Sequence, residues 1–516
     1  MPRTRLVLIF LLAFAARYAA TGAIENDHFV TFTRGLQVLY GDWPVRDFDD
    51  PGFPLSYLIS TLTAAVFGPS LFVNVLLCVA LIALTSTMTF LLAYRATGST
   101  AVAFLAAVIT MAFYPRLYNA TKVIVPVVAI AIAWRYADSP SPGRLVALAV
   151  WTAIAFLMRH DYAVYVAAGN LALLVICHAF ELRVLTIRLA AYVALSVLFI
   201  APWLIYIQLV EGLGEYFASA FRFIAAEGRR TTTTLPPAFF ALTAVPVAGL
   251  LASFKRVARL GPAHIVSACV ILLTLDVVFL RDVLGARIPD VVASTAVVGA
   301  AIAGRFMSER AMRTAATVGF VLLIVVAAAL LPGRANFGTS VNAFARVSQI
   351  SRRLRQVSAE IIPNPSMAPL IAYLSQCTDP QDRVLVTGFG PEIPALARRP
   401  FAARLPTWIP GYYEDAADVN RALARLRDER LGAAVFLDGT PVVERSWPAL
   451  MAAIRDRGYD EYAPGSNNGR LRVWLPHEVH DARRDPATGL PCARVDLKAG
   501  LYGTDRHGAD RHASDR

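Results

Sequence analysis

The sequence predicts a polytopic α-helical membrane protein with about eleven transmembrane helices, followed by a C-terminal extracytoplasmic α/β domain. Three observations lead to this fold class. The chain is 56% hydrophobic and only 17% charged, whereas a soluble domain carries about 25% charged residues. Apolar runs of about 16 to 25 residues recur through the first two thirds, each close to the length that crosses about 30 Å of hydrocarbon. Beyond residue 331 these runs stop, and helical periodicity alternates with short β-branched runs.

The crossings are predicted in order from the N-terminus. The first ends in "AATGA", whose small residues suit signal-peptide cleavage, but the many later spans favour an uncleaved anchor. Segment 54–68 is short for a crossing, and we expect it to lie along the membrane interface. The predicted crossings are 6–23, 70–94, 99–114, 123–136, 144–158, 163–180, 187–209, 236–253, 263–280, 288–304 and 314–331.

Loop charge predicts the orientation. If segment 54–68 does not cross, short loops bearing Arg or Lys fall on one side, as the positive-inside rule requires. The N-terminus is then cytoplasmic, and the C-terminal domain is periplasmic or extracellular, at a bacterial inner membrane. The formal net charge of +12 comes largely from these loops. Without a basic stripe interleaved with aromatic residues, the sequence argues against nucleic-acid binding.

The same patterns predict three regions. They are a transmembrane domain over 1–335, an α/β domain over 345–477, and a tail over 478–516 that is rich in Asp, Arg, Gly and His and expected to be disordered. Cys377 and Cys492 both lie in the external region, where an oxidising compartment permits a disulfide. The alternative is that both thiols are free.

A glycine-containing stretch of the α/β domain, "VTGFGPE", is similar to a nucleotide-binding loop. The pattern is incomplete, and nucleotides are scarce outside the cell. We therefore interpret this stretch as an ordinary turn from a strand to a helix.

The stretch after the first crossing, residues 22–55, carries the strongest functional pattern. Asp27 precedes a predicted surface helix, and Asp49 and Asp50 bring a second acidic group back toward the membrane. Two carboxylate positions around a surface helix suit a base that deprotonates an acceptor, together with a site for a metal or a sugar. Glu25 and His28 flank the base and are candidate substrate-binding residues. A solvated loop is the alternative for all these side chains.

Two further outer loops carry positive charge. In "YPRLYNATK", Arg116 and Lys122 are placed to hold the phosphate of a lipid-linked substrate, and headgroup snorkelling is the alternative. In "MRHDY", Arg159 is a candidate phosphate partner, and His160 and Asp161 are candidate ligands for a divalent metal cation. A structural ion pair between Arg159 and Asp161 is equally compatible with the sequence.

The long outer loop 210–235 has an amphipathic helical pattern closed by Gly228. We expect either a lid that orders over substrate or a helix that lies on the membrane surface.

These residues together resemble a GT-C superfamily glycosyltransferase, close to the lipid A aminoarabinose transferases and the family 39-like protein O-mannosyltransferases. The likeness rests on "ENDHFVTFTRGLQVLYGDWPVRDF" and "FDDPGFPLSYLISTLTAAVFG", which are similar to the family's acidic motif, surface helices and turns. It covers about residues 1–210, and beyond them only the layout of many spans and an external domain matches. The family motif reads Asp-Glu where this chain has Asn26-Asp27-His28.

The resemblance implies transfer of a sugar from a polyprenyl-phosphate donor to a lipid, glycan or protein acceptor, with inversion. It implies that Asp27 is the catalytic base and that Asp49 is the carboxylate associated with a metal or the donor. Two other classes remain open: a transporter or flippase, and a non-catalytic component of cell-envelope polysaccharide assembly. The spans are nearly free of acids, with Asp276 the main exception, which disfavours the transporter.

Overall fold

The structure, a computed structural model, describes residues 3–230, 237–253, 260–281, 288–306, 308, 310–315, 317–319, 343–464 and 469–492. It separates into two compact units: residues 1–21 with 34–347, and residues 22–33 with 348–516. The first is helical and the second is α/β, so we call them the helical unit and the α/β unit. The division falls inside helix α2 (Asn26–Leu39), whose first two turns belong to the α/β unit.

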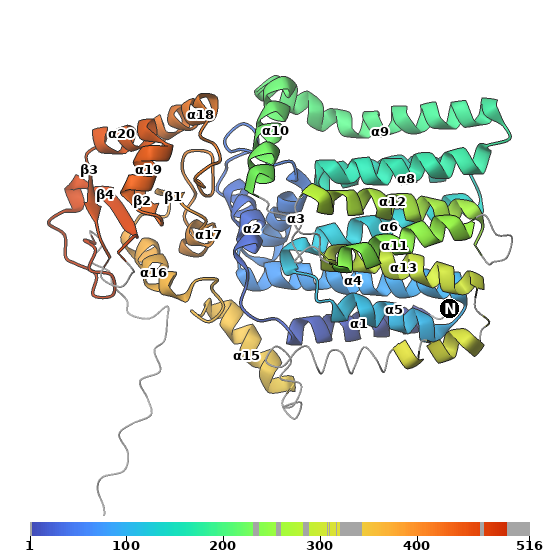
Figure 1. The fold of residues 1–516 in the computed structure, drawn as a ribbon. Coiled ribbons are helices and arrows are strands. Elements are labelled where there is room, and N and C mark those ends of the chain that lie inside the picture. Colours follow the sequence, from blue (N-terminus) through green and yellow to red (C-terminus); the bar gives the residue numbers. More distant parts are fainter. Residues whose placement is uncertain are drawn as a thin grey trace, which may run out of the picture. The chain divides into compact units, whose positions relative to one another are not determined.

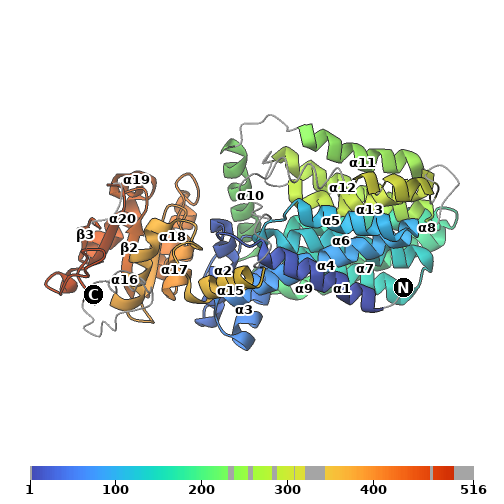
Figure 2. The same cartoon turned by 90° about the horizontal axis from the view of Figure 1, so that it is seen from below.

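The helical unit is a bundle of long helices that lie side by side, with α3 and α10 at one end (Figures 1 and 2). Several of its helices begin at a serine cap. Ser70, Ser99 and Ser141 cap α4, α5 and α7 by accepting hydrogen bonds from backbone N–H groups. The helices are α1 (Arg3–Ala19), α3 (Pro54–Phe67), α4 (Leu71–Thr97), α5 (Thr100–Ala112), α6 (Ala120–Asp138), α7 (Pro142–Met158), α8 (His160–His178), α9 (Leu182–Val210), α10 (Leu213–Arg230), α11 (Pro237–Ser253), α12 (Pro262–Arg281) and α13 (Ile288–Phe306).

Length and composition identify the membrane helices. Within the described residues, five helices are long and apolar enough to cross a membrane: 71–97, 117–138, 160–178, 182–210 and 288–305. Shorter apolar helices accompany them at 54–67, 100–112, 142–158, 239–253 and 262–277. The chain is therefore a multi-pass membrane protein, as predicted. The predicted crossing 314–331 lies largely outside the described residues.

Helix α3 starts and ends at the same end of the bundle. Its Ser56 hydroxyl donates to the carbonyl oxygen of Met158, at the C-terminus of α7. Helix α4 begins after a linker of three residues. Arg95, near the C-terminus of α4, pairs with Asp138 at the C-terminus of α6, which shows that α4 and α6 run parallel. Since α7 runs opposite to α6, Met158 and the start of α4 share one end of the bundle. Residues 54–67 therefore do not traverse it, as the loop charges predicted.

The α/β unit is built on a four-stranded sheet of order β1-β2-β4-β3. Strands β1 (Arg383–Thr387) and β2 (Leu431–Phe436) are parallel, whereas β4 (Arg472–Pro476) pairs antiparallel with both β2 and β3 (Tyr459–Tyr462). Its helices are α15 (Ala343–Gln356), which begins at the unit boundary, α16 (Ala368–Cys377), α17 (Glu392–Ala397), α18 (Ala416–Arg427), α19 (Thr440–Ser446) and α20 (Pro448–Asp456). The α/β class predicted from the sequence is confirmed.

Both faces of this sheet are covered, which explains the nearly continuous apolar strands. Alternate residues of β1 and β2 enter two cores. Val384 and Val386 pack with α16, while Leu385 packs in the core that contains Trp408 and Trp447. Between β1 and α17 the stretch "VTGFGPE" makes a strand-to-helix turn, in which Gly388 has a φ of +84° that favours glycine.

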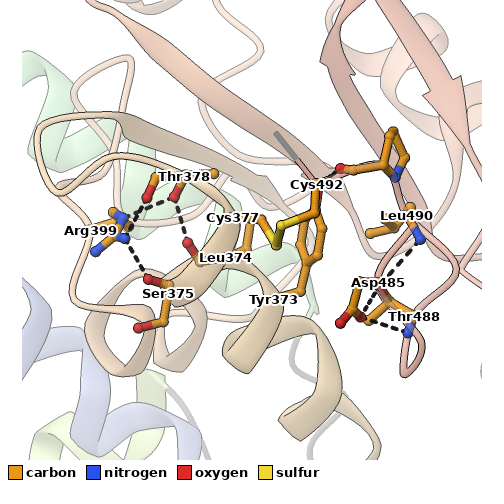
Figure 3. The surroundings of a disulfide bond; sticks show 11 residues. Tyr373, Leu374, Ser375, Cys377, Thr378, Arg399, Asp485, Thr488, Leu490 and Cys492 are labelled. Atoms are coloured by element: carbon orange, nitrogen blue, oxygen red, sulfur yellow. Dashed lines mark hydrogen bonds between the residues drawn. A yellow bond between two sulfur atoms is a disulfide. The ribbon is translucent and has the colours of Figure 1, made fainter. Parts of the chain in front are cut away.

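The last described segment is fastened to α16 by a disulfide between Cys377 and Cys492 (Figure 3). The Tyr373 hydroxyl donates to the carbonyl oxygen of Pro491 at 2.6 Å, and the Asp485 carboxylate accepts from Thr488. The prediction of a disordered tail over 478–516 is therefore wrong for residues 478–492. The disulfide and these hydrogen bonds hold residues whose composition is typical of a disordered segment. Residues 493–516 lie outside the described part.

The assignment of residues 22–33 also differs from the prediction. Residues 22–33 belong to the α/β unit, although the sequence assigned them to the transmembrane domain. Hydrogen bonds join the two segments: the N–H of Ile24 donates to the carbonyl oxygen of Ile361 at 3.0 Å, and the Thr33 hydroxyl donates to that of Pro391 at 2.8 Å. No local sequence pattern announces a contact across more than 300 residues of chain.

Candidate functional site

Polar side chains gather at the end of the helical unit that holds α3, α10 and the start of α8, which we call the acidic end. Asp50 lies at its centre. One oxygen of Asp50, Oδ1, accepts from the backbone N–H groups of Gly52 and Phe53 at 3.1 and 3.3 Å, which fixes the turn into α3. The other oxygen, Oδ2, accepts from the hydroxyl of Tyr216 at 2.6 Å.

Tyr216 connects Asp50 to His160. Its hydroxyl oxygen lies 3.4 Å from His160 Nε2, and the His160 backbone N–H donates to the carbonyl oxygen of Gly52 at 3.0 Å. The His160 ring stacks on Phe156 with a centroid separation of 4.2 Å. Burial and the negative charge of Asp50 raise the pKa of Tyr216, so its hydroxyl remains a hydrogen-bond donor. Through this contact α10 is attached to the turn before α3.

Arg159 and Asp161 form a second polar group on either side of His160. Arg159 Nη2 lies 2.8 Å from Asp161 Oδ2, with side chains 20% and 25% exposed, so the pair is largely shielded from water. Asp161 also accepts from the hydroxyl of Tyr165 at 3.3 Å. The carboxylate of Asp290, which accepts from the Asn119 side-chain amide at 3.0 Å, acts electrostatically on Arg159. The structural ion pair considered from the sequence is therefore present.

The two basic side chains of "YPRLYNATK", Arg116 and Lys122, both contact Tyr118. Arg116 donates to the hydroxyl of Tyr118 at 2.8 Å, and Lys122 Nζ lies 5.5 Å from the centre of the same ring. Arg17, in the last turn of α1, donates to the carbonyl oxygen of Pro115 at 3.2 Å while 2% exposed. This end of the bundle therefore holds several guanidinium groups close to backbone and aromatic partners.

Asp49 and Asp50, the two acids predicted at this position, make different contacts. Asp49 contributes its backbone carbonyl oxygen, which accepts from Arg34 Nε at 3.4 Å. Asp50, and not Asp49, is the carboxylate that faces Tyr216 and His160.

The metal prediction finds no matching donor set. Within the described residues, no group of three or more His, Cys, Asp or Glu side chains is arranged to hold a metal ion. Asp161 faces Arg159, and the Tyr216 hydroxyl lies between His160 and Asp50. His160 and Asp161 are thus engaged with protein partners, and their role as metal ligands stays a prediction.

Glu25, Asp27 and His28 belong to the α/β unit. The predicted helix after the first crossing is confirmed as α2, with Asp27 in its first turn. Asp27 and Glu25 are exposed, whereas His28 is 2% and Phe29 0% exposed. The helix thus buries one face and presents the Asp27 carboxylate on another.

A buried acid that the sequence analysis missed lies in the same unit. Glu392, at the start of α17, is 2% exposed, and its Oε2 has no hydrogen-bond partner in the described structure. Burial raises the pKa of Glu392 to about 7. A cavity of ≈ 700 Å³ in this unit, beside the disulfide, is lined by none of the predicted site residues.

Sequence reasoning missed other residues, some of which left a signal. Asp290 is an acid in the first turn of a predicted span that starts on the outer side, so the predicted topology already placed it with Arg159. Arg17 was visible as a charge inside the first apolar run. Tyr216 gave no signal, because a tyrosine in an amphipathic pattern is ordinary.

Comparisons with known proteins give a fold. No family model matches the chain, and no curated protein matches it. Among solved structures it is similar to ArnT from Cupriavidus metallidurans, determined bound to undecaprenyl phosphate, with a TM-score of 0.57 and 15% sequence identity. The alignment covers 91% of this chain and 97% of that one. The chain therefore shares the fold of ArnT, in agreement with the fold that the sequence resemblance implied.

Proposed function

We propose that this chain is a membrane glycosyltransferase that moves a sugar from a polyprenyl-phosphate donor to an acceptor on the non-cytoplasmic face. The observation that carries the proposal is the polar cluster of Asp50, Tyr216, His160 and Arg159 at one end of a GT-C-fold bundle. Support comes from ArnT, the structural neighbour, which binds a polyprenyl phosphate in its solved structure.

The donor phosphate is assigned to the cations of the acidic end. Arg159 is planar, largely shielded from water and held in place by Asp161, so it is preorganised for a phosphate oxygen. Arg116 and Lys122 add positive charge beside Tyr118. Such groups stabilise the charge that develops on the leaving phosphate.

Asp27 is assigned the role of the base. Its carboxylate takes the proton of an acceptor hydroxyl while that oxygen bonds to the anomeric carbon. The bond from this carbon to the phosphate oxygen breaks, and the polyprenyl phosphate leaves with the electron pair. One displacement inverts the anomeric configuration. The exposure of Asp27 in the first turn of α2 supports the role, because an acceptor can reach it.

The disulfide supports the proposed compartment. Cys377 and Cys492 are bonded in the α/β unit, and disulfides persist in oxidising compartments. Residues 22–33 are part of this unit, so Asp27 shares its compartment. The basic loops at the other end of the bundle support a cytoplasmic location for that end.

The test is sugar transfer by purified protein in proteoliposomes. Radiolabelled polyprenyl-phosphate pentoses and hexoses are supplied with envelope extract, and labelled product is separated from donor. Asp27→Asn is expected to lower transfer by about 10²- to 10⁴-fold. Asp428→Asn, an exposed acid that follows α18 in the same unit, is the matched control and should remain at the wild-type rate.

Two outcomes would reject the proposal. If Asp27→Asn transfers sugar at the wild-type rate, Asp27 is not the base. If wild-type protein moves labelled donor across the bilayer without forming a new glycosidic bond, the chain is a transporter.

A further inference from the structure

We propose that the α/β unit is the positioning element for Asp27, and that the loop after β1 docks the helix that carries this residue. The inference rests on the proposed function, because it assumes that Asp27 is the base. It assigns a role to Thr33 and to the "VTGFGPE" turn.

Two hydrogen bonds hold the segment at its two ends. At the start, the backbone N–H of Ile24 donates to the carbonyl oxygen of Ile361 at 3.0 Å. At the other end, the Thr33 hydroxyl donates to the carbonyl oxygen of Pro391 at 2.8 Å, and Thr33 is 2% exposed. Asp27 lies between these two hydrogen-bonded residues, so the backbone that carries it is held on both sides by the rest of the α/β unit.

The buried face of α2 fixes the rotation of the helix. His28, Phe29 and Phe32 are 2%, 0% and 2% exposed, and the rings of Phe29 and Phe32 meet edge to face with centroids 6.5 Å apart. Residues three and four apart share one face of a helix. Because Asp27 is exposed on another face, a helix that cannot roll keeps its carboxylate in one direction.

The docking loop occupies a particular place in the sheet. Pro391 follows β1, at the C-terminal edge of the parallel pair β1 and β2, where open α/β sheets bind their ligands. In this chain the loop binds a segment of the same polypeptide through the Pro391 carbonyl oxygen. A side chain on Gly390 would come within 2.7 Å of Leu437 Cδ1, so the loop needs glycine for close packing.

Thr33→Val tests the positioning role, since it keeps the shape of the side chain and removes its donor. We expect the kcat for transfer to fall about tenfold with the KM for the donor unchanged, because the donor site is untouched. Thr33→Ser should restore kcat to within about twofold, because it restores the hydroxyl. The matched control is Thr186→Val, whose hydroxyl bonds within its own helix α9 to Leu182; it should leave both constants unchanged.

A second measurement does not depend on activity. Ile24→Cys combined with Ile361→Cys should form a disulfide on mild oxidation, detected by non-reducing peptide mapping, because the backbones of these residues are hydrogen-bonded. The crosslinked protein should keep wild-type transfer.

The inference is overturned if the crosslink fails to form, if crosslinked protein is inactive until reduced, or if Thr33→Val has wild-type kcat. These results are distinct from failure of the proposed function. The crosslink needs no transfer assay, and the function itself is rejected by an active Asp27→Asn variant.

Discussion

The two ends of the helical bundle use the same residue types for different purposes. At the end opposite the acidic end, which we call the basic end, Asp138 pairs with Arg95 and accepts from His264 Nε2 at 2.9 Å. Arg144 donates there to the carbonyl oxygens of Arg135 and Ser139 at 2.7 and 2.8 Å. These contacts join the C-terminus of α6 to α4, α7 and α12, so their role is structural.

At the acidic end Arg159, His160 and Asp161 lie at the junction between α7 and α8. Arg159 and Asp161 are 20% and 25% exposed, compared with 29% and 47% for Arg95 and Asp138. A tyrosine from α10 lies between His160 and Asp50. Residue type alone therefore does not identify the site. The candidate site differs from the basic end in its shielding from water, in the convergence of several helices and in its nearby cations.

The largest expected difference comes from the two Arg–Asp pairs. Arg159→Ala should lower sugar transfer by about 10²- to 10³-fold, because it removes a charge-assisted phosphate contact and leaves Asp161 unpaired. Arg95→Ala removes the equivalent pair at the basic end and should change transfer by less than about twofold, since exposed pairs contribute little. Proteoliposome transfer rates at equal protein content measure both. Equal losses of transfer rate in the two variants would show that the two ends do not differ in function.

The next largest effect concerns the compartments assigned to the two ends. Replacing both Cys377 and Cys492 with Ser should lower the free energy of unfolding of the α/β unit by about 2 to 4 kcal/mol, because the bond closes a loop across 115 residues. Cys177→Ser, at a free cysteine of the helical unit, is the control. Limited proteolysis in urea with and without reductant reports both variants. If reductant does not change the stability of the wild-type α/β unit, the result would count against an oxidising compartment for this unit.

A pH effect distinguishes the paired acids of the acidic end from Glu392, whose Oε2 has no partner in the described structure. Burial raises the pKa of Glu392 to about 7 in the folded chain, from an ordinary 4.5. The folded state then binds the proton more tightly, so the free energy of unfolding falls as pH rises from 4.5 through 7, by about 3 kcal/mol. Glu392→Gln should remove this dependence, measured by hydrogen exchange of the α17 amides. A wild-type exchange profile that is flat over this range contradicts the assignment.

The smallest expected effect concerns two tyrosine hydroxyls. Tyr216→Phe removes the donor to Asp50 and should lower transfer about five- to tenfold. Tyr136→Phe removes a hydroxyl that lies 2.9 Å from His178 Nε2, away from the acidic end, and should have no effect on transfer. Steady-state kinetics of sugar transfer by the two variants measure the difference. Equal transfer rates would show that the hydrogen bond from Tyr216 of α10 to Asp50 has no role in transfer.

Much of the fold was predictable because hydrophobic length and loop charge act locally. The approximate starts of α4, α5 and α7 followed from the apolar runs, and the path of segment 54–68 followed from its length and from loop charge. The α/β class followed from the alternation of periodicities.

The candidate site was predicted less completely because it is assembled across long separations. The link from Tyr216 to Asp50 spans 166 residues, and that from Asn119 to Asp290 spans 171. Nothing near either residue in the sequence specifies its partner. Likewise, the sequence allowed a bond between Cys377 and Cys492, but the composition of the stretch before Cys492 gave no sign that it is ordered.

The central claim is that the acidic end faces the non-cytoplasmic compartment and the basic end faces the cytosol. Its most direct test is labelling of single engineered cysteines by a membrane-impermeant maleimide in sealed right-side-out vesicles. Arg46→Cys replaces a side chain that is 59% exposed at the acidic end, and Ser139→Cys replaces an exposed residue at the basic end. We expect Arg46→Cys to be labelled in intact vesicles and Ser139→Cys only after permeabilisation. The reverse pattern would contradict the central claim.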